Sequence, residues 1–209
     1  MFILALVIVV FLVSAPSGNW SRAMALAIEF AALLVVIATS RMRRDIRGTR
    51  FAIVAVAAGV LVALTAAGVL HPVVTYSIGG VLFLVIPATL TRGLVRLFRT
   101  HGVTLQGVAG ALAIYLMVGL LFASVIGVTA AISSEPYFAS GTDGTQSERI
   151  YYSFTTLTTT GFGDFTAGIP TGRAIAVVEM LTGQLYLVTV IGILVGSLAS
   201  GSRDRGERS

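Results

Sequence analysis

Six apolar segments divide the chain, and short polar stretches separate them. The segments cover residues 2–15, 23–40, 51–70, 73–91, 103–132 and 172–199. Most of them are close to the ~20 residues that a helix needs to cross the hydrocarbon core of a bilayer. The pattern therefore predicts an all-α transmembrane protein with six transmembrane helices per chain.

The first segment has two interpretations. It is short, and it ends in the small residues Val13-Ser14-Ala15, which suit a secretory cleavage site. No basic stretch precedes it, and Pro16 would follow the cut. We favour a helix that is retained in the mature protein.

The positive charges predict the orientation. The chain contains no lysine, and its arginines gather in loop 41–50, in loop 92–101 and in the tail 201–209. Arginine-rich loops stay on the cytoplasmic side, so we expect both termini in the cytoplasm of a multi-pass protein of the cell membrane, surrounded by lipid. This placement explains the net charge of +5 without a nucleic-acid partner.

Composition argues against an enzyme. Hydrophobic residues make up 56% of the chain and charged residues 11%, which leaves little for a soluble domain. Cysteine is absent, and the two histidines lie far apart. We expect no catalytic residues and no organic cofactor.

One stretch of hydroxyls and glycines interrupts the apolar pattern between the last two segments. It reads Thr155-Thr156-Leu157-Thr158-Thr159-Thr160-Gly161-Phe162-Gly163-Asp164. Non-helical backbone at membrane depth is tolerated only inside protein or beside a water-filled path. Glycines take positive φ at low cost, so successive carbonyls can turn the same way and replace the hydration shell of a monovalent cation. Before it, a polar external loop ends in Thr145-Gln146-Ser147-Glu148, which predicts a capping box and a short re-entrant helix over 147–158.

These residues resemble the signature of the potassium channel pore family. The resemblance covers about residues 103–200 and implies an outer helix in the fifth segment, a pore helix, and an inner helix in the sixth. It implies a selectivity filter at Thr159, Thr160, Gly161, Phe162 and Gly163, with K⁺ ions bound at Thr159, Thr160, Gly161 and Phe162. One such loop per chain cannot close a ring around an ion, so we expect a homotetramer.

The resemblance also assigns supporting and gating residues. The residues expected to support the filter are Tyr151, Tyr152, Thr155, Asp164 and Glu179. Tyr151 would bond Asp164, and the Glu179 carboxylate would accept a hydroxyl from Thr155 or Thr156. Gly183 is either a gating hinge or a site of close helix packing. The residues expected to line the pore below it are Gln184, Leu187, Ile191 and Val195.

Three departures from the common family pattern bear on selectivity. Thr160 replaces the usual valine, Phe162 replaces tyrosine, and Tyr151 and Tyr152 stand where tryptophans are frequent. Fewer restraining bonds predict a filter that inactivates readily or selects less strictly.

The chain divides into a membrane domain over 1–100, a pore domain over 101–200 and a cytoplasmic tail over 201–209. The first resembles a voltage sensor in position, but segment 73–91 carries no arginine. Arg92, Arg96 and Arg99 follow it, and Glu29 is the one acid in the second segment. We therefore do not expect steep voltage gating.

The leading hypothesis is passive potassium conduction. Two alternatives stay open: a weakly selective monovalent cation channel, and a non-conducting regulatory subunit of the membrane.

Overall fold

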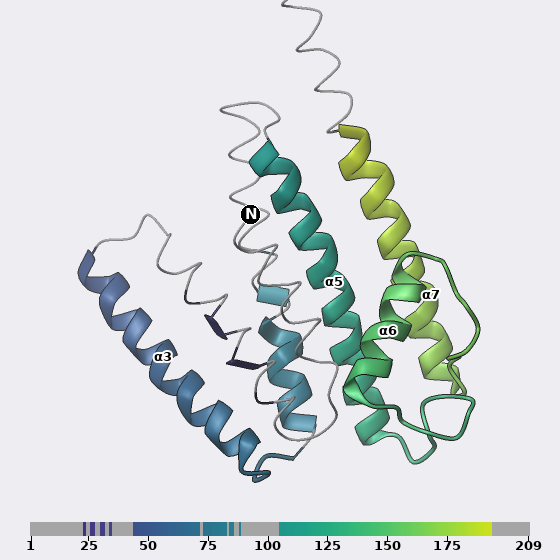
Figure 1. Ribbon diagram of the computed structural model, residues 1–209, viewed down its shortest axis with the longest axis horizontal. Coiled ribbons are helices and arrows are strands. Elements are labelled where there is room, and N and C mark those ends of the chain that lie inside the picture. Colours follow the sequence, from purple (N-terminus) through teal and green to yellow (C-terminus); the bar gives the residue numbers. More distant parts are fainter. Residues whose placement is uncertain are drawn as a thin grey trace, which may run out of the picture.

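The computed structural model describes residues 44–71, 73–82 and 105–193, together with scattered residues between 23 and 34 and between 84 and 88. The regular elements of these ranges are helices (Figure 1). They are α3 (Arg44–Ala66), a short helix Val73–Leu82, α5 (Leu105–Ile132), α6 (Gln146–Leu157) and α7 (Pro170–Tyr186), which a π-helical turn continues over Leu187–Ile191. Apart from an isolated bridge between Phe138 and Ala167, the described residues contain no β-structure, so the all-α prediction is confirmed.

Two of the described helices are long and apolar enough to cross a membrane. They are Gly107–Ile132 and Pro170–Val190, and they correspond to the fifth and sixth predicted segments. α3 differs from its prediction, because it begins at Arg44 and not at residue 51. The prediction of a loop over 41–50 is therefore wrong from Arg44 onward. Arginine is a good helix former, and an apolar pattern alone does not detect a polar first turn.

Several predictions fall outside the described residues. These are the first predicted segment, most of the second, the linker 92–101, the end of the inner helix and the tail 201–209. Glu29 and Val195 lie there as well. The count of six helices and the boundary between the two domains stay predictions.

The second half of the chain forms a helical hairpin with a short helix packed inside it. α5 and α7 run in opposite directions, and α6 lies against both near the end where loops 133–145 and 158–169 meet (Figure 1). Two glycines allow this close approach. A Cβ at Gly119 would lie 2.5 Å from the Phe154 ring, and one at Gly183 would overlap the Leu157 carbonyl oxygen. The close packing of α6 on Gly119 and Gly183 therefore fixes its position between α5 and α7.

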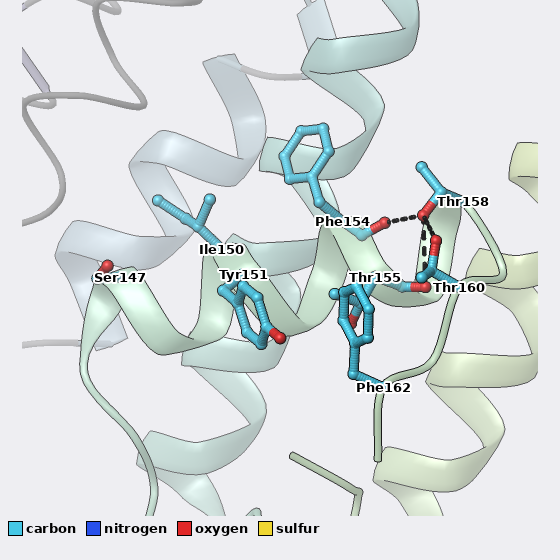
Figure 2. A pocket seen from close by; sticks show the side chains of 8 residues that line it. All are labelled: Ser147, Ile150, Tyr151, Phe154, Thr155, Thr158, Thr160 and Phe162. Atoms are coloured by element: carbon cyan, nitrogen blue, oxygen red, sulfur yellow. Dashed lines mark hydrogen bonds between the residues drawn. The ribbon is translucent and has the colours of Figure 1, made fainter. Parts of the chain in front are cut away.

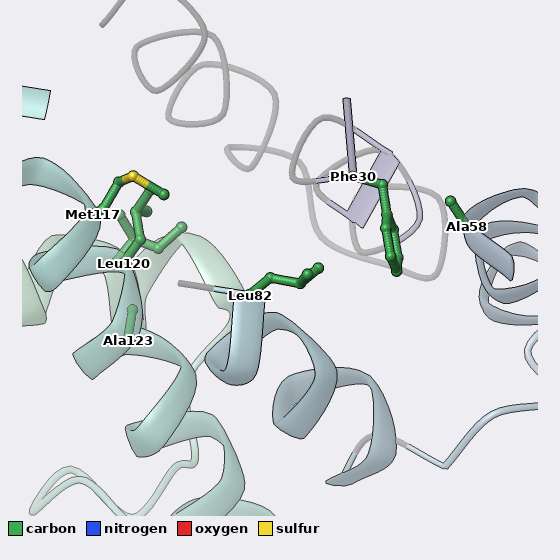
Figure 3. Packing of buried hydrophobic residues seen from close by; sticks show 7 residues of the cluster. Phe30, Ala58, Leu82, Met117, Leu120 and Ala123 are labelled. Atoms are coloured by element: carbon green, nitrogen blue, oxygen red, sulfur yellow. The ribbon is translucent and has the colours of Figure 1, made fainter. Parts of the chain in front are cut away.

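Two buried clusters hold this arrangement together. The inner cluster joins the first half of the chain to α5 and α6, and consists of Phe30, Ala58, Leu82, Met117, Leu120, Ala123 and Ile150. Figure 3 shows Leu82 between the α5 side chains and those of Phe30 and Ala58. The aromatic cluster, Tyr137, Phe138, Tyr152 and Phe165, packs edge to face between the two loops.

Candidate functional site

The site begins at the first turn of α6, where a capping box fixes the helix. The Thr145 N–H donates to Glu148 Oε2 at 2.6 Å, and the Glu148 N–H donates to Thr145 Oγ1 at 3.3 Å. These bonds satisfy backbone donors that have no partner inside the helix. The predicted capping box is confirmed, and the helix covers 146–157 where 147–158 was expected.

The last turn of α6 anchors the stretch that follows, residues 158–164, which we call the glycine loop. The Thr158 N–H donates to Phe154 O at 3.1 Å, and the Thr159 N–H donates to Thr156 O at 2.9 Å. The next two N–H groups, of Thr160 and Gly161, both donate to Thr155 O, at 2.8 and 3.1 Å. All four donors are thus directed back at the helix. Among the described residues, no group donates to the carbonyl oxygens of residues 159–163.

The backbone of the glycine loop alternates in conformation. φ is positive at Thr159 (56°), Gly161 (54°) and Gly163 (84°). Positive φ at the two glycines confirms the prediction. Thr159 is the one non-glycine residue in the described part of the chain with positive φ, a conformation that costs a β-branched residue about 1–2 kcal/mol. Such strain persists where the surrounding structure imposes it, and it concentrates at functional sites.

The threonine hydroxyls of the loop have partners within the same chain. Gln184 Nε2 donates to Thr159 Oγ1 at 2.8 Å, so this α7 side chain meets the base of the loop. Thr158 Oγ1 donates to Phe154 O at 2.7 Å and lies 2.8 Å from Thr160 Oγ1 (Figure 2). The hydroxyl of Thr160, which stands where the family usually has valine, is therefore hydrogen-bonded.

A groove of about 420 Å³ lies between α6 and the glycine loop (Figure 2). It is lined by Ser147, Ile150, Tyr151, Phe154, Thr155, Thr158, Thr160 and Phe162. Tyr151 and Phe162 stack across it with ring centroids 6.3 Å apart and planes 9° apart. Phe162 is 69% exposed, so one chain does not cover the back of the loop.

Asp164 closes the glycine loop at its far end and is next to Tyr151. The hydrogen bond between the phenol and the Asp164 carboxylate is the largest cause that raises the pKa of Tyr151. The same carboxylate accepts the Phe165 N–H at 3.0 Å. The structure thus brings Tyr151 and Asp164 together at the mouth of the site.

The other two predicted supports on α6 take different positions. Tyr152 is buried in the aromatic cluster, away from the groove. Thr155 lines the groove and donates its hydroxyl to Tyr152 O of its own helix at 2.9 Å.

Glu179 is completely buried where α5, α6 and α7 meet. The Ser153 hydroxyl contacts Glu179 Oε1 and lies 2.7 Å from Gly119 O. The expected partners Thr155 and Thr156 were wrong: the hydrogen-bonded residue is Ser153. Successive helix residues are rotated by about 100°, and Ser153 is the hydroxyl that α6 directs at both α5 and α7. Glu179 Oε2 has no hydrogen-bond partner among the described residues.

α7 places the predicted gating residues on two faces. Gly183 is buried against Leu157, while Gln184 is exposed and Leu187 is half-buried. The contact at Gly183 supports the close-packing interpretation, and the hinge remains a prediction. The backbone of Ile191 lies in the π-helical turn, and its side chain is outside the described set.

The comparison with protein families agrees with this architecture. Residues 114–199 match the model of a family described as ion channels. No curated protein and no solved structure matches the chain. The matched range begins within α5 and includes α6, the glycine loop and α7. The resemblance inferred from the threonine and glycine pattern is thereby confirmed.

Proposed function

Because residues 114–199 match the model of a family described as ion channels, we propose that four copies of the chain form a pore that conducts K⁺ passively. Residues 159–163 are the selectivity filter of this pore. The K⁺ ions are the transported substrate, bound at Thr159, Thr160, Gly161 and Phe162. The chain catalyses no covalent step.

The observation that carries the proposal is the backbone of the glycine loop. Positive φ at every second residue allows successive carbonyls to turn to one side, while four N–H groups are bonded to α6. Carbonyl oxygens without donors are the ligands that replace the water of a dehydrating K⁺ ion. A ring of such oxygens needs the same loop from neighbouring copies on a shared axis, which leads to the tetramer.

Charges at both ends of the site favour a cation. The C-terminal end of α6 directs its carbonyls toward the glycine loop, and a helix dipole places about −0.5 elementary charge there. Asp164 adds a carboxylate at the outer mouth. Thr159 and Gln184 provide polar groups at the base, and Gln184 and Leu187 line the start of the pathway toward the cytoplasm.

The exposed apolar surface supports assembly in a membrane. One face of α7 presents Val177, Val178, Leu181, Leu185 and Val188 to the outside of the single chain. In the tetramer, lipid and neighbouring copies cover this face, and a neighbour fills the groove behind Phe162. The Asp164 end faces outward, and both termini are cytoplasmic.

A second candidate, a weakly selective cation channel, has one observation in its favour. Phe162 has no hydroxyl, so its described ring contact is stacking on Tyr151, without a phenol hydrogen bond. A less restrained filter adapts more easily to ions of other sizes.

Reconstitution of the purified protein in lipid vesicles decides between the candidates. Selective conduction predicts a reversal potential that follows the K⁺ gradient and ignores Na⁺, whereas weak selectivity predicts a potential that follows both. Thr160→Val together with Phe162→Tyr is then expected to increase the K⁺ preference of a weakly selective pore. A wild-type protein that forms tetramers and yet passes neither ion would refute both candidates and favour the regulatory subunit.

A companion measurement tests ion binding without flux. A bound ion stabilises the assembled state by mass action, so K⁺ is expected to raise the melting temperature of the tetramer relative to Na⁺. A Gly161→Ala variant is the control, since it changes the backbone conformation that creates the sites.

A further inference from the structure

A buried positive charge lies near the start of α6. Arg149 is 8% exposed, and it lies near the helix N-terminus, where the dipole disfavours a positive charge. Within α6 and its cap, its Nε donates to Thr145 O at 3.2 Å. No carboxylate pairs with Arg149 in the part of the chain that the structure describes. A buried arginine in this position needs other partners, because burial of an unpaired charge is costly.

The further partner of Arg149 comes from the first half of the chain. Arg149 Nη2 donates to the Tyr76 hydroxyl at 2.9 Å, and the guanidinium carbon lies 4.7 Å from the centroid of the Tyr76 ring. The contact therefore combines a charge-assisted hydrogen bond with a cation–π interaction. Tyr76 belongs to helix Val73–Leu82, so this contact joins two parts of the chain that are 73 residues apart.

Space for the contact depends on a glycine of α5. A Cβ at Gly127 would lie 3.0 Å from Tyr76 Cγ and 3.2 Å from Arg149 Nη1. A side chain there would displace the ring and the guanidinium together. Three helices thus meet at one junction, which we call the Tyr76 junction and which comprises Tyr76, Gly127 and Arg149.

The junction has a direct connection to the glycine loop. α6 is a single helix from Gln146 to Leu157, so a tilt at Arg149 is carried to its last turn. That turn holds the N–H groups of residues 158–161 through Phe154, Thr155 and Thr156. Leu82 and Ile150, from the same two helices, both belong to the inner cluster.

We propose that Tyr76 is a positioning residue through which the first half of the chain controls the glycine loop. A movement of helix Val73–Leu82 pulls on Arg149, tilts α6 and changes the fraction of glycine loops that conduct. The inference rests on the proposed function, and it adds a site of regulation outside the pore half.

The absence of cysteine from the chain permits a test of the junction that does not depend on conduction. In a Tyr76→Cys/Gly127→Cys variant, one sulfur replaces the Tyr76 ring, which lies within contact distance of a Cβ placed at residue 127, and disulfides need Cβ atoms roughly 3.5–4.5 Å apart. We expect a disulfide within the chain under mild oxidation, detected as a mobility shift that a reductant reverses. A Ser77→Cys/Gly127→Cys variant is the matched control, because Ser77 is the exposed neighbour of Tyr76. Equal cross-linking of both pairs, or of neither, would overturn the junction.

Regulation is tested by current from the reconstituted tetramer. Tyr76→Phe keeps the ring and removes the hydroxyl, while Tyr76→Leu removes both, so the ratio of conducting to non-conducting channels should change roughly tenfold in the second and less in the first. Arg149→Gln should resemble Tyr76→Leu, Arg149→Lys should be intermediate, and Ser77→Ala should match the wild type. The double variant Tyr76→Leu/Arg149→Gln should be no worse than either single one, because the residues act through one contact.

Two results separate this proposal from a merely structural role. Tyr76→Leu should change the open fraction of each assembled channel without changing the amount of tetramer, and Tyr76→Phe should change it less. Variants that lower the yield of tetramer and leave the open fraction of each assembled channel unchanged would overturn regulation through Tyr76. If the wild type conducts nothing, the proposed function fails, while the cross-linking result still decides whether the junction exists.

Discussion

α6 and the glycine loop are neighbours in sequence, but their surroundings are opposite. α6 buries Ser153, Tyr152 and Leu157 between α5, α7 and the outer loops. Residues 158–164, directly after it, are all exposed, and the groove beside them is open. A single chain thus holds α6, which supports the site, in place by its own contacts. It leaves the carbonyl groups of the glycine loop uncovered.

This difference indicates which contacts one chain supplies and which it leaves to others. The helix receives its caps, its hydroxyl bonds and its aromatic packing from the same chain. The backbone of the glycine loop receives hydrogen bonds for four of its N–H groups, and no described group donates to the carbonyl oxygens of residues 159–163. Outside the Tyr76 junction, substitutions in α6 and its contacts should therefore affect folding, whereas substitutions in the glycine loop should affect conduction.

The largest effect is expected at Gly183, where α7 packs against α6 without space for a side chain. In Gly183→Ala, the added methyl overlaps the Leu157 carbonyl, and backbone cannot yield as a flexible side chain does. Overpacking of this kind costs about 1–3 kcal/mol per chain, so the yield of folded tetramer and its melting temperature should fall. Gly192→Ala, further along the same helix, meets nothing within 4 Å and is the control. Equal yields of the two variants would contradict the close packing of α6 on α7.

A substitution in the glycine loop should reduce conduction and leave the yield of tetramer unchanged. Gly161 has φ +54° and open space around it, so Gly161→Ala introduces strain of about 1–2 kcal/mol without a steric clash. We expect assembled tetramers with little or no K⁺ flux. Gly141→Ala imposes a similar backbone cost in the external loop, at φ +81°, and should conduct normally. If Gly161→Ala conducts as well as Gly141→Ala, the loop is not the filter.

A moderate effect on the support is expected at the buried acid. Ser153→Ala removes the hydroxyl that contacts Glu179 and leaves a buried carboxyl oxygen unpaired, at a cost of about 1–3 kcal/mol. Thermal unfolding of the tetramer measures this loss. The control is Ser124→Ala, because Ser124 bonds a carbonyl of its own helix. Glu179→Gln with unchanged selectivity and inactivation would show that the carboxylate does not brace the filter.

The smallest effect is expected at the outer mouth, where the loop and the support touch. The hydrogen bond to Asp164 raises the pKa of the Tyr151 phenol above its ordinary value of 10.0. The contact is therefore complete below pH 10.0 and is lost as the pH rises through the raised pKa. Inactivation of the current should accelerate over that alkaline range. Tyr151→Phe should inactivate faster at neutral pH and lose this pH dependence, and a pH dependence that survives the substitution would assign it to another group.

Much of the support was predictable from local patterns. The capping box at Thr145 and Glu148, the span of α5 and the positive φ of Gly161 and Gly163 each depend on residues within a few positions of one another. Chemistry at short range is written in the sequence, because caps, helical propensity and glycine conformations need no distant partner. The predicted partner of Glu179 was wrong, because the pattern of hydroxyls along a helix does not show which hydroxyl faces two other helices.

By itself, the sequence determined the class of the protein. It did so through apolar segments of membrane length, a run of threonines and glycines between the last two segments, and an aspartate directly after that run. Only the tertiary structure decided that Ser153 meets Glu179, that Thr159 takes positive φ, and that Tyr76 reaches Arg149 across 73 residues. Composition and spacing fix how each segment folds. Long-range contacts depend on how helices rotate and pack against one another, and that is set by the fit of all their side chains at once.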